Sequence, residues 1–108
     1  MFEEIKKKLK EFEIFKQIDD DRLEQLCSNT QIVLLEENDI LIKKGEPCHK
    51  GLYFVYDGEI FVENPDTQIS YTVGKGGIVG ITAFTGKTSY AVNATCSKES
   101  ELIFIPDI

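Results

Sequence analysis

The first thirty residues carry a helical pattern of apolar and polar positions. Apolar residues recur every three or four positions, with Glu and Lys between them, at Phe2, Ile5, Leu9 and Phe12. This spacing predicts one apolar face of a helix, and the slip of the pattern at Ile14-Phe15 predicts a break near residues 13–18. The acidic run Asp19-Asp20-Asp21 is a helix-start signal, so we expect a second, short helix over residues 20–28.

From residue 31 the pattern changes to short apolar runs separated by turn residues. These runs predict strands at 31–35, 40–42, 52–56, 59–62, 69–73, 91–96 and 102–105. The run 52–56 is the most aromatic and is expected to be central, and Asp57-Gly58 after it predicts a two-residue type I′ hairpin. Seven or eight short strands at even spacing favour an antiparallel sandwich or rolled barrel. Because the strands follow the helices without alternating with them, the pattern disfavours parallel βαβ folds.

Length and charge narrow the classes of function. The 108 residues suffice for one domain with one core. A net charge of −7 argues against this segment gripping nucleic acid or an anionic membrane, since both need a basic face. The three cysteines form no CxxC spacing, which is typical of a reducing cytosol. No run approaches a membrane span and the N-terminus is too charged for a signal peptide, so a cytoplasmic location is expected.

Five of the eight glycines fall between residues 74 and 86. Glycines at this density permit positive φ and close approach of the backbone to another group. A Gly-rich turn that opens onto a helix aims free N–H groups outward and can hold an anion. A plain tight connection between two strands explains the same composition, and the glycines alone leave both interpretations open.

Taken together, the landmarks resemble the cyclic nucleotide-binding domain family, and within it the sensor half of catabolite-activator and fumarate-nitrate-reductase (Crp/Fnr) type regulators. The resemblance rests on the lead-in at 15–26, the strand and glycine turn at 40–46, the stretch 52–60, and Gly76, Gly80 and Ala83. It implies an eight-stranded antiparallel jelly-roll barrel with N-terminal helices. It also implies that the Gly-rich stretch is the phosphate-binding cassette, which bridges two strands.

The resemblance implies a ligand-binding cassette made of Gly76, Gly80, Ile81, Thr82, Ala83, Tyr90, Ala91 and Val92. Family members usually carry a glutamate for the ribose hydroxyl at the position of Ile81, and an arginine for the cyclic phosphate at that of Tyr90. Lys87 lies nearby, but a flexible ammonium does not reproduce the planar fork of arginine. Because both charge-assisted contacts are missing, we expect a degenerate cassette without tight cyclic AMP binding.

Other chemistry has little support in the sequence. Cys48-His49 is the only adjacent pair of soft ligands, and His49 is the only histidine. A metal or haem site needs more convergent ligands, so we predict no metal and no cofactor and take His49 as a surface turn residue. A single histidine also argues against an enzymatic cupin. Without a supported catalytic set, the protein is expected not to be an enzyme.

The resulting hypothesis is a single sensor domain over residues 1–108, with a helical lead-in at 1–29 and a jelly roll at 31–105. Its small-molecule effector is unidentified, and DNA contact belongs to a C-terminal dimer helix and helix-turn-helix module that this chain lacks. The chain is then either a fragment of a longer, dimeric regulator or a stand-alone domain. Two alternatives stay open: a working cyclic nucleotide-binding module with an atypical cassette, and a protein-interaction domain with a vestigial pocket.

Overall fold

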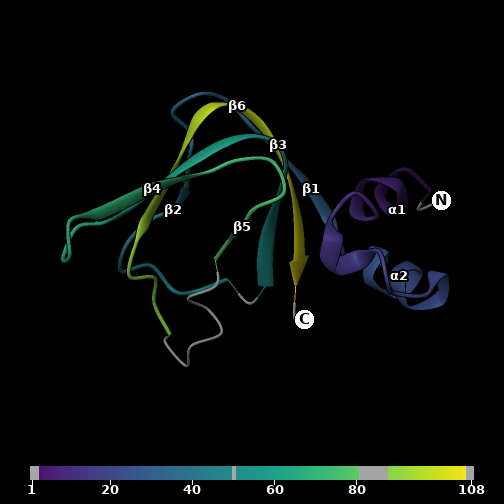
Figure 1. Ribbon diagram of the computed structural model, residues 1–108. Helices are drawn as coiled ribbons and strands as arrows, with labels where there is room; N and C mark the ends of the chain where they lie inside the picture. The colour runs from purple at the N-terminus through teal and green to yellow at the C-terminus, as the bar shows by residue number, and fades with distance from the viewer. Residues whose placement is uncertain (1–2, 50, 81–87, 107–108) are drawn as a thin grey trace.

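The computed structural model describes residues 3–49, 51–80 and 88–106. Two short helices lie together beside strand β1, and the hairpin of β3 and β4 projects on the opposite side of the molecule (Figure 1). The elements in chain order are α1 (Glu3–Leu9), a 3₁₀ turn (Glu13–Phe15), α2 (Asp20–Cys27), β1 (Gln31–Leu35), β2 (Ile40–Ile42), β3 (Gly51–Asn64), β4 (Ile69–Val73), β5 (Ile78–Val79) and β6 (Asn93–Pro106). The expected class, mainly β with N-terminal helices, is confirmed.

The helical lead-in follows its local signals. Helix α1 ends at Leu9, and the 3₁₀ turn occupies the expected break. Asp19 caps α2, because its Oδ1 accepts a hydrogen bond of 2.9 Å from the backbone N–H of Arg22. The apolar faces of the lead-in bury an outer cluster against the sheet: Leu9, Phe12, Phe15, Leu23, Cys27, Phe54, Ile103 and Ile105.

The sheet has six strands, all paired antiparallel, and is organised around β3 and β6. The strand order is β1-β6-β3-β4, with β2 also on β6 and β5 also on β3. The expected number of seven or eight short strands differs from this structure, because β3 and β6 are each 14 residues long. Each long strand takes the place of two predicted ones, and the two-residue strand β5 is not among the predicted runs. Over the described residues the sheet is not closed into a complete barrel.

The predicted hairpin at Asp57-Gly58 is wrong. Both residues lie inside β3, where the pairing with β6 shifts register three times between Val55 and Ile60. Gly58 has a φ of +113°, and a Cβ placed on it would lie 2.0 Å from the Oγ of Ser100. The glycine therefore serves a bulge at which two strands touch, and the strand bends there without reversing.

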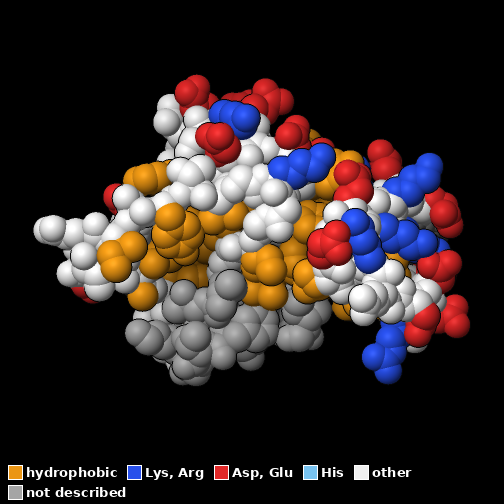
Figure 2. Space-filling view, viewed as in Figure 1, with side chains coloured by type: hydrophobic (Ala, Val, Ile, Leu, Met, Phe, Trp, Pro, Cys, Tyr) orange, Lys and Arg blue, Asp and Glu red, His pale blue; other side chains and the backbone are white. Residues whose placement is uncertain are grey.

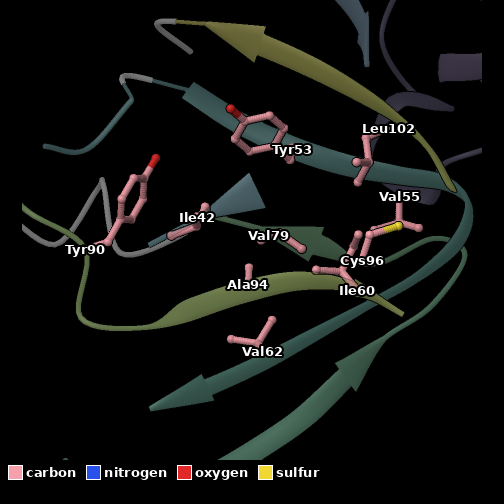
Figure 3. Close-up of a cluster of buried hydrophobic side chains, with 10 residues drawn as sticks. All are labelled: Ile42, Tyr53, Val55, Ile60, Val62, Val79, Tyr90, Ala94, Cys96 and Leu102. Atoms are coloured by element: carbon pink, nitrogen blue, oxygen red, sulfur yellow. The ribbon is translucent and has the colours of Figure 1, made fainter. Parts of the chain in front are cut away.

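The inside of the roll is filled by side chains from five segments (Figure 3). This inner cluster consists of Ile42, Tyr53, Val55, Ile60, Val62, Val79, Tyr90, Ala94, Cys96 and Leu102. Tyr53 and Tyr90 lie at one end of it and Val55 lies at the other (Figure 3). Alternation along the strands explains the selection, because Tyr53 and Val55 of β3 point inward while Phe54 points to the helices.

Candidate functional site

The predicted cassette is divided between two places in the structure. Gly76 has a φ of +90° and donates its N–H to the backbone oxygen of Val55 at 2.9 Å. It borders a small hollow of about 40 Å³ together with Phe12 and Tyr56, on the side of the helices. Gly80, with a φ of +99°, lies against the ring of Tyr53 instead, so the two glycines do not share one surface. Ile81, Thr82, Ala83 and Lys87 lie outside the described residues.

The segment that contains Tyr90 is hydrogen bonded through its backbone to the turn after β2. The N–H of Gly45 donates to the oxygen of Tyr90 at 2.9 Å, and the N–H of Tyr90 donates to the oxygen of Glu46 at 3.0 Å. The N–H of Cys48 donates to the oxygen of Thr88 at 2.9 Å. These bonds form a short antiparallel ladder, which holds Tyr90 in a defined position at the end of the roll.

The side chain of Tyr90 is an interior group. It is 3% exposed, and its hydroxyl oxygen accepts a 2.8 Å hydrogen bond from the backbone N–H of His49. The hydroxyl of Tyr53 is hydrogen bonded to Nδ1 of the same histidine at 2.9 Å. Both tyrosine rings meet the imidazole edge-on, and Tyr53 also packs on Phe104 with ring centroids 4.6 Å apart. An aromatic group thus closes this end of the inner cluster.

The phenols of Tyr53 and Tyr90 carry no charge where the resemblance places an arginine. Burial raises the pKa of Tyr53 and of Tyr90, and the hydrogen bond from His49 lowers that of Tyr90 by less. Both phenols are therefore neutral at physiological pH. A neutral hydroxyl offers a phosphate one hydrogen bond at most, in place of the two parallel bonds of a guanidinium.

The remaining predicted residues are less informative. Ala91 and Val92 are half-buried beside Tyr90, and Val92 packs against the inner cluster. His49 is exposed, as expected for a turn residue, but sequence reasoning missed its contacts with the two tyrosines. The contact of Tyr53 with His49 depends on the tertiary fold.

The part of the chain that the structure describes contains neither a cluster of metal ligands nor a membrane-spanning helix. No three or more His, Cys, Asp or Glu side chains among the described residues come together in a way that could hold a metal ion. No helix in the same part of the chain has the length and apolar character needed to cross a membrane.

Comparison with known protein families matches residues 32–107 to the family described as "Cyclic nucleotide-binding domain". The chain belongs to the cyclic nucleotide-binding domain family. The match starts in β1 and covers all the strands that follow, including the segment that holds Tyr90. A search of curated protein sequences found no match.

Solved structures of similar fold come from regulators. The sensor domain of the transcriptional regulator DNR from Pseudomonas aeruginosa has a TM-score of 0.82 at 16% identity, over 94% of this chain and 74% of that one. The N-terminal domain of a transcriptional regulator from Streptomyces coelicolor has a TM-score of 0.70 at 21% identity, over 85% of this chain and 68% of that one. At these identities the likeness concerns the fold, and it confirms the jelly-roll class.

A third similar structure comes from a kinase subunit. The regulatory subunit of a cAMP-independent protein kinase A from Trypanosoma brucei has a TM-score of 0.79 at 19% identity. This chain spans 38% of that subunit, and 94% of this chain is covered. A variant of the subunit with three substitutions, one of them threonine to arginine, is bound to cAMP in its A site.

Proposed function

We propose that this chain is an effector-sensing regulatory domain whose cassette does not bind cyclic AMP or cyclic GMP tightly. The observation that carries the proposal is Tyr90. It stands at the position that resembles the phosphate-binding arginine, and its hydroxyl, which accepts the N–H of His49, is neutral and has one hydrogen to donate. Ile81, at the position of the ribose-binding glutamate, removes the second charge-assisted contact.

The expected loss of affinity is large. Hydrogen bonds to charged groups contribute about 1.5–3 kcal/mol each. Two missing contacts therefore amount to about 3–6 kcal/mol, or a factor of about 10² to 10⁴ in Kd. The phosphate would also lose its hydration against a neutral phenol and backbone N–H groups alone. A nucleotide that binds a typical cassette in the micromolar range would then need millimolar concentrations here.

The regulatory role draws on the family and on the shape of the molecule. The family is one of regulatory ligand-binding domains, and the similar folds include sensor domains of transcriptional regulators. We infer that an unidentified effector, held near Tyr90, biases the position of the end of β6. The chain's net charge of −7 disfavours DNA contact by this domain itself, and we propose that a separate module of the regulator makes that contact. On this proposal the domain works in the cytoplasm and catalyses no reaction.

The test restores the two charges and compares affinities. Isothermal titration of Ile81→Glu combined with Tyr90→Arg should give at least tenfold tighter binding of cyclic AMP than the unchanged chain. Ile81→Gln combined with Tyr90→Phe is the matched control, because it alters both sites without adding charge and should bind no more tightly than the unchanged chain. Circular dichroism first checks that both variants fold. The cAMP-bound kinase-subunit variant, in which one substitution introduces an arginine, supports this design.

The two alternatives give different results. A working nucleotide-binding module with an atypical cassette would bind cyclic AMP or cyclic GMP saturably in the micromolar range without substitution. A protein-interaction domain with a vestigial pocket would bind no nucleotide even with both charges restored.

A further inference from the structure

Strand β4 lies at the end of the strand order. Within residues 3–49, 51–80 and 88–106 it pairs with β3 and with no other strand. Its sequence, Ile-Ser-Tyr-Thr-Val, holds no charged residue and no proline. Natural edge strands are usually protected by such residues, because an exposed row of N–H and C=O groups can pair with another chain.

One face of this hairpin is both apolar and exposed. Tyr71 lies opposite Val62 and Ile69 lies opposite Asn64, so these side chains share the inward face of β3. Val62 is only 2% exposed, whereas Tyr71 is 56% and Ile69 is 63% exposed. The apolar layer of the inner cluster therefore continues onto β4 without a cover among the described residues. Figure 2 shows hydrophobic side chains gathered beside the projecting hairpin.

We propose that β4 pairs antiparallel with β4 of a second copy of this chain, about a two-fold axis at Tyr71. In this register Ile69 faces the partner's Val73, Ser70 faces the partner's Thr72, and Tyr71 faces its own equivalent. Apolar residues then meet apolar residues on one face, and small hydroxyl residues meet on the other. The sequence of β4 is therefore self-complementary in this register, and β4 of a second copy can pair with it without any other part of the chain.

Charge favours this edge over the other end of the strand order. Two copies with a net charge of −7 repel one another, so contact is least costly where the surface is neutral. Strand β1 is also uncharged, but the hollow beside it is lined by four carboxylates, those of Glu36, Asp57, Glu99 and Glu101. Pairing there would bring the carboxylates of Glu36, Asp57 and Glu99 of two copies together, since among the described residues only Glu101 of this group is paired with a lysine, Lys8. Strand β4 carries no charge; Glu63 of β3 lies opposite Ser70, and Asp66 in the turn is paired with Lys44.

The pairing closes after two copies. A two-fold interface uses the same edge of both chains, so no free β4 edge remains for a third copy. Five residues on each side form a small interface, well below the size of an obligate one. The expected dimer is therefore weak and dependent on concentration.

Engineered cysteines test the register directly. Opposed residues across an antiparallel pair are close enough for a disulfide. Tyr71→Cys alone should form a covalent dimer on mild oxidation. Ile69→Cys and Val73→Cys should each stay largely monomeric alone and should cross-link when mixed. Leu34→Cys, an exposed position on β1, and the unchanged chain with its own three cysteines are the controls.

Sedimentation equilibrium tests the association without cross-links. The apparent mass of the unchanged chain should rise from the monomer value of 12.2 kDa towards twice that value as the concentration rises. Tyr71→Lys should weaken the association at least tenfold, and Leu34→Lys, with the same change of charge, should leave it unchanged. A chain that stays monomeric at all concentrations overturns the proposal. Pairing of β4 with a strand of a different protein would not rescue it. Cross-linking of Leu34→Cys as readily as Tyr71→Cys overturns it too.

Discussion

Replacing Gly58 with alanine should destabilise the fold far more than an ordinary glycine substitution. Gly58 sits in the bulge of β3 with a φ of +113°, and an added Cβ would lie 2.0 Å from the Oγ and 2.6 Å from the Cα of Ser100. The Oγ of Ser100 accepts a 3.0 Å hydrogen bond from the N–H of Glu59, and Ser100 is 4% exposed. The methyl group therefore has to push apart two strands that are bonded at this point.

The expected cost has two parts. Holding a non-glycine residue in this region of φ costs about 1–3 kcal/mol. Displacing Ser100 leaves the part-buried N–H of Glu59 without its partner, which costs about 1–3 kcal/mol more. A total of about 4 kcal/mol is a large part of the roughly 5–15 kcal/mol that stabilises a domain of this size. With a urea m value of about 2 kcal/mol/M, the midpoint of unfolding should fall by about 2 M.

Gly45 supplies the control. Its φ of +90° is also left-handed, but no described atom lies within 4 Å of an added Cβ. Gly45→Ala should therefore cost only the backbone term, about 1–2 kcal/mol. Urea unfolding followed by circular dichroism gives both midpoints. Equal losses of stability in the two variants would refute the packing argument, because they would leave nothing for the contact with Ser100.

Three further predictions concern the helix cap, the buried phenols and the thiols. Asp19→Ala should cost about 1 kcal/mol in urea unfolding, because the N–H of Arg22 loses its acceptor; an unchanged midpoint would contradict the cap. Burial raises the pKa of Tyr53 and Tyr90, so their contribution to stability is complete below about pH 10 and is lost as pH rises through the folded pKa values. Unfolding free energies measured from about pH 8 to about pH 11 should fall at the alkaline end, and a flat profile would count against buried phenols. Cys48, which is half-buried, should be alkylated before Cys27, which is 1% exposed and has a pKa raised by burial. Peptide mass spectrometry gives the order of alkylation, and the reverse order would contradict the burial of Cys27.

Local signals predicted most of the fold. The caps and apolar periodicity of the helices are properties of neighbouring residues, and β1, β2 and β4 match the predicted runs. The error at Asp57-Gly58 has a physical reason, because a glycine with positive φ suits a two-residue turn and a bulge equally well. Ser100, which is distant in sequence, decides between them through the contact of β3 with β6.

The candidate site was only partly accessible to sequence reasoning. The position of Tyr90 in the cassette could be assigned from the resemblance. Nothing in the sequence indicates that His49 is hydrogen bonded to the hydroxyls of both Tyr53 and Tyr90. That arrangement arises because the turn after β2 folds back onto the segment before β6, which brings residues from separate parts of the chain together. Ligand affinity at this site stays a prediction.

Calorimetric titration of the unchanged chain with cyclic AMP and with cyclic GMP tests the central claim most directly. We expect no saturable heat in the micromolar range for either nucleotide, because Tyr90 and Ile81 supply neither the cation nor the carboxylate. Saturable micromolar binding of either nucleotide would contradict the proposed loss of affinity.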